Sequence, residues 1–169
     1  MRIREATISD AFSISKVHID TWRSTYKGIV TDEYLNELSY YKQEKRWINI
    51  MNDDSKAINY IFVAEDEENR IIGFASCGTE REGDKFFKGE LYAIYIIKEY
   101  QNKGVGKLLF NSVVKKIKEL KFNSMIIWAL EDNHPACGFY ELMDGKKIKE
   151  KDIKIGNNTF KEVAYGFII

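Results

Sequence analysis

The chain has 169 residues, of which 44% are hydrophobic and 31% charged, a profile typical of a compact globular protein. Lys and Arg together number 26, and Asp and Glu also number 26, so the formal net charge is zero. Proteins that bind nucleic acid usually carry a basic excess, so this balance disfavours DNA, RNA or a membrane surface as the main partner.

Two cysteines, Cys77 and Cys137, are too few for a disulfide framework. They lack the paired spacing of a zinc site, so no metal is expected. The N-terminal residues contain no apolar leader segment, and no stretch of about 18 apolar residues occurs in the chain. We therefore expect a cytoplasmic protein. The length and the absence of a linker predict one domain over residues 1–169.

The N-terminal part of the chain is predicted to be mainly helical after one short strand. Ser9 is the expected cap of the first helix, which is predicted to end near Gly28, and Thr31 is the expected cap of the second. Two alternating apolar runs around an acidic turn then predict a hairpin. The expected elements are a strand at 3–7, helices from 9, from 31 and through 47–51, and strands at 60–64 and 70–77.

Residues 91–97 are apolar on both faces, as expected of a strand in the middle of a covered sheet. Apolar residues at helical spacing follow between Val105 and Leu120. The remaining expected elements are a strand at 125–130, a short helix starting near 133–136, and strands at 146–155 and 160–168 around a turn at 156–158. This order predicts an α/β or α+β domain with a mixed sheet.

A glycine-containing loop lies between the predicted central strand and the long helix. Glycines allow successive backbone N–H groups to point into one concavity, and the N-terminus of the helix adds donors and partial positive charge. Lys103 and Lys107 add two cations. The pattern favours a phosphate or pyrophosphate ligand, with an ordinary surface turn as the alternative. The loop reads Gln101-Asn102-Lys103-Gly104-Val105-Gly106-Lys107.

Two well-known phosphate motifs do not match this loop. A Walker loop requires Ser or Thr after Gly-Lys, where this chain has Leu108. A dinucleotide-binding fingerprint requires a third Gly or Ala, where this chain has Leu109. Neither a P-loop nucleotide site nor a dinucleotide site is therefore expected.

Two segments resemble the GCN5-related N-acetyltransferase (GNAT) family. Residues 101–106, with the strand before them, are similar to its Q/R-x-x-G-x-G/A motif, and residues 133–141 (NHPACGFYE) resemble its N-x-x-A-x-x-F-Y-E segment. The chain departs from the family after Glu141, where Gly145 is present but the aromatic residue that usually follows is not. The resemblance implies the GNAT fold: a mixed sheet of six to seven strands with helices on both faces and a splayed cofactor cleft.

The resemblance also implies acetyl-CoA as the cofactor. The family holds the pyrophosphate on the loop backbone and the pantetheine arm against the preceding strand, whose open edge offers unpaired N–H and C=O groups. Asn133 matches a residue that either contacts the cofactor arm or caps a helix, and both interpretations are open. The implied cofactor-binding residues are Ile94, Tyr95, Ile96, Gln101, Asn102, Lys103, Gly104, Val105, Gly106, Lys107 and Asn133.

Acyl transfer to an amine requires a neutral amine, a stabilised oxyanion and a proton for the leaving thiolate. Tyr140 matches the family tyrosine that lies near the sulfur and acts as general acid. Glu90 stands where histone-acetylating members carry a base, and the alternative is a solvated strand end. The backbone amide near Ile96 is the implied oxyanion donor. The family transfers directly in a ternary complex, so Cys137 is not expected to carry an acetyl group.

Trp22 and Tyr26 lie four residues apart on one face of the first helix, in the region that shapes acceptor pockets in this family. They are candidates for binding an amine by cation–π contact, with core packing as the alternative.

The function implied is an N-acetyltransferase that acts on a primary amine, such as a polyamine, in a protein that is a candidate homodimer. The alternatives are a protein N-terminal or lysine acetyltransferase and a CoA-binding module without turnover.

Overall fold

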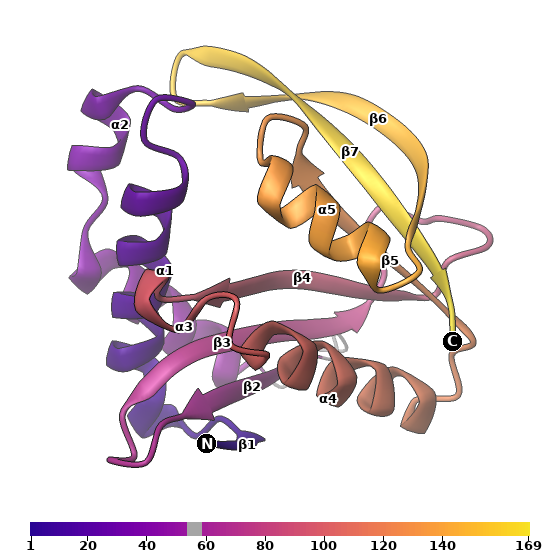
Figure 1. Ribbon diagram of the computed structural model, residues 1–169, viewed down its shortest axis with the longest axis horizontal. Coiled ribbons are helices and arrows are strands. Elements are labelled where there is room, and N and C mark those ends of the chain that lie inside the picture. Colours follow the sequence, from indigo (N-terminus) through magenta and orange to yellow (C-terminus); the bar gives the residue numbers. More distant parts are fainter. Residues whose placement is uncertain (54–58) are drawn as a thin grey trace.

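The computed structural model describes residues 1–53 and 59–169, and one seven-stranded sheet runs through them in the order β1-β2-β3-β4-β5-β7-β6 (Figure 1). Neighbouring strands are antiparallel throughout, except for β4 and β5. The strands are β1 (Arg2–Glu5), β2 (Asn59–Glu65), β3 (Ile71–Thr79), β4 (Gly89–Ile96), β5 (Ser124–Leu130), β6 (Lys146–Ile155) and β7 (Asn158–Ile168).

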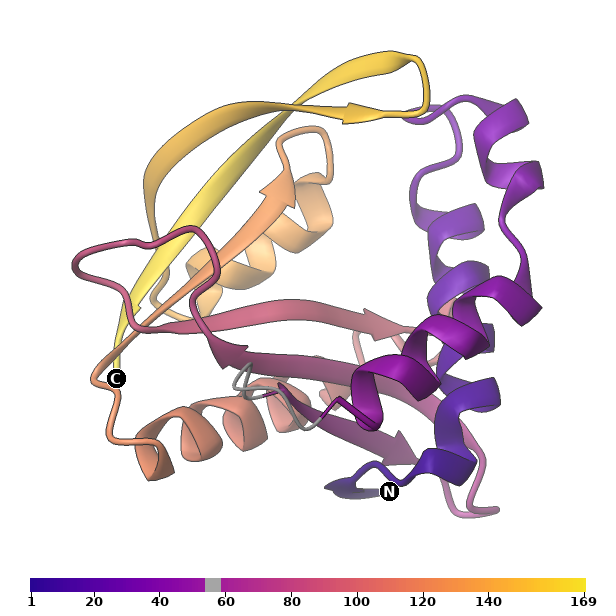
Figure 2. The same cartoon turned by 180° about the vertical axis from the view of Figure 1, so that it is seen from behind.

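Helices cover both faces of the sheet, as Figures 1 and 2 show from opposite sides. One face packs against α4 and α5 around a core that includes Leu109, Val113 and Phe167. The other face packs against α1 and α3 around Ile14, Trp47 and Phe74. The helices are α1 (Ala11–Thr25), α2 (Asp32–Glu37), α3 (Tyr40–Met51), α4 (Val105–Glu119) and α5 (His134–Leu142), with single 3-10 turns at Ile8–Asp10 and Lys98–Tyr100.

The predicted mixed sheet with helices on both faces is therefore confirmed, and no strand boundary differs from its predicted position by more than two residues. Thr31 caps α2 as expected, its hydroxyl accepting a hydrogen bond from the Tyr34 N–H. A third, smaller core joins the end of α1 and α2 to β5, β6 and β7 through Tyr26, Leu35 and Ile155.

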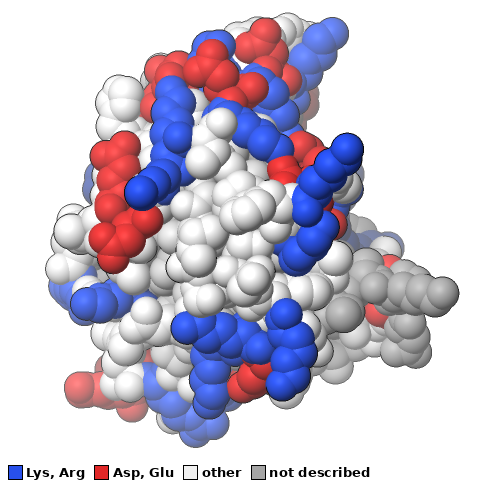
Figure 3. Space-filling view, turned by 90° about the vertical axis from the view of Figure 1, so that its right-hand side faces the viewer, with Lys and Arg blue, Asp and Glu red and all other residues white. Residues whose placement is uncertain are grey.

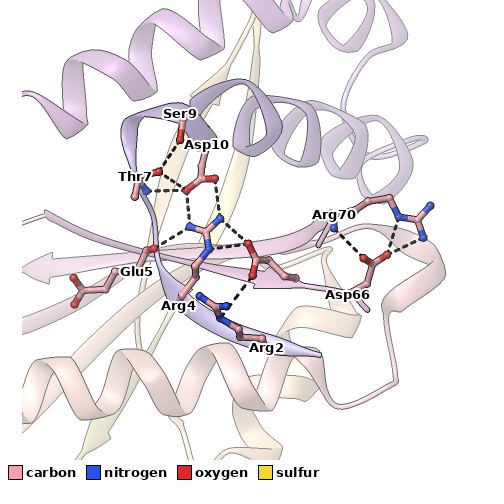
Figure 4. Close-up of polar contacts among 9 residues, drawn as sticks. Arg2, Arg4, Glu5, Thr7, Ser9, Asp10, Asp66 and Arg70 are labelled. Atoms are coloured by element: carbon pink, nitrogen blue, oxygen red, sulfur yellow. Dashed lines mark hydrogen bonds and ion pairs between the residues drawn. The ribbon is translucent and has the colours of Figure 1, made fainter. Parts of the chain in front are cut away.

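The predicted cap at Ser9 is wrong, because the chain turns two residues earlier. Thr7 precedes a 3-10 turn, and its N–H donates to the Asp10 carboxylate at 2.7 Å. Arg4 clamps this turn to the sheet by donating to both Asp10 oxygens, at 2.7 and 2.9 Å, and to Glu65 at 2.7 Å (Figure 4). The guanidinium holds the pKa of Asp10 at about 2, so the carboxylate stays charged.

Candidate active site

The sheet opens where the sequence resemblance implies a cleft. Among the described residues, pairing between β4 and β5 is limited to Gly89 with Met125 and Glu90 with Ile126. Beyond that point β4 continues to pair with β3, up to Gly73 opposite Ile96. The edge of β4 that faces β5 therefore offers backbone N–H and C=O groups to a ligand, along residues 91–96.

The glycine loop follows β4 and begins α4. Asn102 and Gly104 have positive φ values of 57° and 85°, and Gly104 is the N-cap. The first helical hydrogen bond runs from the Leu108 N–H to the Gly104 carbonyl at 3.2 Å, so the amides of residues 105–107 precede it. Backbone N–H donors at the positive end of a helix dipole are the groups that an anion such as pyrophosphate requires.

Side chains around the loop fix its approach to the strand. The Gln101 amide donates to the Ile96 carbonyl at 2.9 Å, which ties the loop to the last residue of β4. A Cβ on Gly106 would lie 3.3 Å from Ile96 and 3.4 Å from Phe139, so a larger residue would crowd the junction with α5. Gln101 thus shapes the loop, while its predicted contact with the cofactor stays a prediction. Lys103 and Lys107 are exposed beside it.

Tyr140 lies on α5, near Tyr95 of β4, and is only 4% exposed. Burial, reinforced by the nearby Tyr26 and Tyr95 hydroxyls, raises the pKa of Tyr140 well above its usual value. No hydrogen-bond partner is among the groups that shift this pKa. A phenol that is protonated is suited to donate a proton to a leaving group.

The Tyr26 and Tyr95 hydroxyls lie near each other between the end of α1 and β4. The Trp22 indole N–H donates to the Tyr95 hydroxyl at 3.0 Å, and the Trp22 and Tyr26 rings pack at 4.7 Å. Asn133 caps α5 by accepting from the Ala136 N–H at 3.3 Å, and its amide lies 3.4 Å from the Tyr26 hydroxyl. The capping interpretation of Asn133 is thus present together with a contact to the tyrosine pair.

Glu90 is 3% exposed at the closed end of the opening, so the alternative of a solvated strand end is wrong. Arg81 engages its carboxylate through its backbone N–H at 3.1 Å, its Nε at 3.1 Å and its Nη2 at 2.5 Å. The catalytic role of Glu90 stays a prediction, and its carboxylate is already paired with Arg81.

Cys137 does not have the properties of a nucleophile. Burial raises the pKa of its thiol, and its Sγ lies 3.7 Å from the Leu130 carbonyl. The thiolate that a covalent mechanism requires is therefore disfavoured. Among the described residues, no group of three or more His, Cys, Asp or Glu side chains is placed to hold a metal.

The departure from the family after Glu141 forms a tight turn. Asp144 adopts a positive φ of 67°, and the Gly145 N–H donates to the Tyr140 carbonyl at 2.8 Å. A Cβ on Gly145 would lie 2.5 Å from the Phe167 ring and 2.7 Å from that carbonyl. Glycine is required here because β7 packs directly against the end of α5.

Several residues of the opening were not identified from the sequence. His18 stacks on Tyr95 with ring centroids 4.9 Å apart, and burial lowers its pKa to about 4, so it is neutral. Trp128 on β5 and Glu162 on β7 lie on the sheet face that bears Tyr26. The alternation of side chains along residues 160–164 predicts which of them share a face of the strand. It does not predict which face is turned toward the site.

Charge is distributed in patches although the total is zero. Residues 98–121, which contain the loop and α4, hold seven lysines and two glutamates. Figure 3 shows one face of the molecule, on which basic and acidic side chains surround an uncharged centre. The local basic excess near the loop suits a polyanionic ligand. No helix within the described residues has the length and apolar character needed to cross a membrane.

The family described as "Acetyltransferase (GNAT) family" matches residues 19–144. The chain is 36% identical over 165 residues to an uncharacterized N-acetyltransferase, YuaI, of Bacillus subtilis, covering 98% of this chain and 91% of that one. It is 25% identical to a spermidine N(1)-acetyltransferase of Thermoplasma acidophilum, covering 98% of each.

Solved structures share the fold. The PaiA N-acetyltransferase of Thermoplasma acidophilum in complex with coenzyme A superimposes with a TM-score of 0.76 at 23% identity, covering 95% of this chain and 96% of that one. A ribosomal-protein-alanine N-acetyltransferase of Brucella melitensis gives a TM-score of 0.78 at 19% identity, covering 100% of each. With the family match and the 36% identical relative, the chain belongs to the GNAT family of N-acetyltransferases, whose acetyl donor is acetyl-CoA.

Proposed function

We propose that this enzyme transfers the acetyl group of acetyl-CoA to a primary amine of a small molecule, such as a polyamine, in a ternary complex. The observation that carries the proposal is the opening between β4 and β5, with the start of α4 near its Ile96 end and the buried Tyr140 near Tyr95 of β4. A helix N-terminus, an open strand edge and a buried phenol would meet, in this order, the pyrophosphate, the pantetheine arm and the thioester of acetyl-CoA.

On the donor side, the amides of residues 105–107 would hold the pyrophosphate, with Lys103 and Lys107 nearby. The open edge at Ile94, Tyr95 and Ile96 would pair with the amides of the pantetheine arm, with the N–H near Ile96 as oxyanion donor. When bound, acetyl-CoA supplies the thioester whose C–S bond breaks as the C–N bond forms. Tyr140 would give its proton to the departing sulfur, because its raised pKa keeps it protonated.

On the acceptor side, the surroundings suit a cation. A hollow of about 430 Å³ lies next to β5, and its charged and aromatic lining includes the acids Glu80, Glu82 and Asp84, the lysines Lys85 and Lys149, and Trp128. Lys149 pairs with Asp84, and Lys151 pairs with Glu82, so these acids are partly compensated. The relative named for spermidine, at 25% identity, supports an amine of this class. Trp22 and Tyr26 stay candidates for acceptor contact.

The test is to incubate the protein with acetyl-CoA and a panel of diamines, polyamines, amino acids and N-terminal peptides, and to measure free CoA with a thiol reagent. We expect release above the hydrolysis blank for polyamines. CoA release only with peptides or proteins would favour a protein acceptor. If no amine in the panel gives CoA release above the blank, a CoA-binding module is favoured. The cytoplasmic location and the homodimer stay predictions.

A further inference from the structure

Glu162 is a partly buried acid on β7. Register along the sheet places it opposite Leu130 of β5 and Lys151 of β6. Its neighbour at alternate spacing, Phe160, packs in the small core with Leu130 and Tyr26. The Glu162 side chain therefore lies on the face that meets α1, next to the tyrosine pair.

The Glu162 carboxylate differs from Glu90 in having little compensation. Its side chain is 17% exposed, and its ion-pair partner is Lys151 at 3.9 Å. Lys151 is itself shared, because it also pairs with Glu82 and lies 4.0 Å above the Trp128 ring. None of the described residues donates a hydrogen bond to Glu162, whereas Arg81 donates three to Glu90. Glu162 is thus the carboxylate that is free to accept a proton.

Charged and titratable groups from all the surrounding elements act on Glu162. Burial raises the pKa of its carboxyl, Glu82 and Glu90 raise it further, and Lys151 and Arg81 oppose this. Burial raises the pKa of the Tyr26 and Tyr95 hydroxyls, and the negative charge of Glu162 adds to this effect, which indicates that the three groups lie near one another. Tyr26 and Tyr95 in turn act on Tyr140 of α5.

We infer that Glu162 is the general base that accepts the proton of the acceptor ammonium group. In this step an N–H bond of the ammonium breaks and an O–H bond forms on Glu162, and the neutral amine becomes the nucleophile. As the amide forms, the second N–H proton of the amine replaces the proton that Tyr140 gives to the sulfur, and the proton on Glu162 passes to solvent. Tyr140 thereby acts as the acid and Glu162 as the base, next to the Tyr26–Tyr95 pair. The inference rests on the proposed function, because it requires an amine acceptor.

Two acceptors separate a base from a structural residue. One is a polyamine, which is cationic at the assay pH, and the other is a fluorinated primary amine, which is already neutral there. We expect Glu162→Gln to lower kcat for the polyamine by about 100-fold but to lower kcat for the neutral amine by less than about 10-fold. Glu150→Gln, which removes an exposed carboxylate on β6, is the matched control and should keep both rates.

The pH profile of the unmodified enzyme gives a second test that does not depend on the folding of a variant. With the polyamine, kcat should fall as the pH drops through the Glu162 pKa, at a midpoint above the ordinary 4.5, and the neutral amine should lack this limb. If Glu162→Gln lowers kcat equally for both acceptors, or if the pH profile of kcat is the same for both, the role of Glu162 is overturned while the proposed function stands. No turnover by the unmodified enzyme with any small amine would instead overturn the proposed function, and this inference with it.

Discussion

Replacing Tyr140 by phenylalanine tests the proposed general acid with little disturbance of the fold. The Tyr140 side chain is buried, and no hydrogen-bond partner is among the groups that shift its pKa, so removal of the hydroxyl should cost little internal hydrogen bonding. We expect the free energy of unfolding to stay within about 0.5 kcal/mol. A positioned acid typically contributes about 10²- to 10⁴-fold in rate, so kcat should fall by that factor, or about 2.7–5.4 kcal/mol in activation free energy.

The control is the neighbouring Tyr165, whose ring centroid lies 5.7 Å from that of Tyr140. Its hydroxyl donates to Glu141 at 3.1 Å, so Tyr165→Phe should lower the unfolding free energy by about 1 kcal/mol and leave kcat nearly unchanged. The assay is CoA release at saturating acetyl-CoA, with acetyl-CoA affinity measured separately. Unchanged turnover in Tyr140→Phe, or a loss of turnover matched by an equal loss of acetyl-CoA affinity, would refute the general-acid assignment.

Three further predictions concern the stability of the fold. Gly104→Ala places a side chain at φ 85°, so it should lower the unfolding free energy by about 1 kcal/mol and weaken acetyl-CoA binding. Its control is Gly138→Ala, which adds a side chain in open space on α5 and should not destabilise the protein. Equal melting temperatures of the two variants would contradict this prediction. Gly145→Ala should destabilise by about 1–3 kcal/mol, because its Cβ would lie 2.5 Å from Phe167, and denaturant unfolding measures this. The pKa of Asp10 is about 2 in the folded state against 3.8 normally, so its contribution to stability should be complete above pH 3.8 and lost as the pH falls through 2. Asp10→Asn should remove this pH dependence of the melting temperature. An acid transition that is unchanged in the variant would contradict the prediction.

Much of the fold could be predicted from the sequence because the local signals agree with the tertiary structure. The apolar run at 91–97 is a central strand, and the spacing of Val105, Leu109 and Val113 marks the buried side of α4. The cap was wrongly placed at Ser9 because Arg4 and Glu65, which fix the position of Asp10, are 61 residues apart in the chain.

The site was predicted unevenly for a related reason. The loop at 101–107 is contiguous, so its geometry follows from local glycines and a helix start. Glu90 and Glu162 look alike in sequence, and only the folded chain brings Arg81 onto one and leaves the other beside the tyrosines. Tyr95 was expected to contribute through its backbone alone, but its hydroxyl accepts a hydrogen bond from Trp22 of α1. Such pairings depend on sheet order, which local sequence does not encode.

The most direct test of the proposed function is a crystal structure of the protein with CoA bound. We predict that the pyrophosphate lies on the amides of residues 105–107 and that the pantetheine arm follows the open edge of β4. The sulfur should then lie within hydrogen-bond distance of the Tyr140 hydroxyl. A pyrophosphate bound elsewhere, or a sulfur out of reach of Tyr140, would contradict the assignment of this opening as the active site.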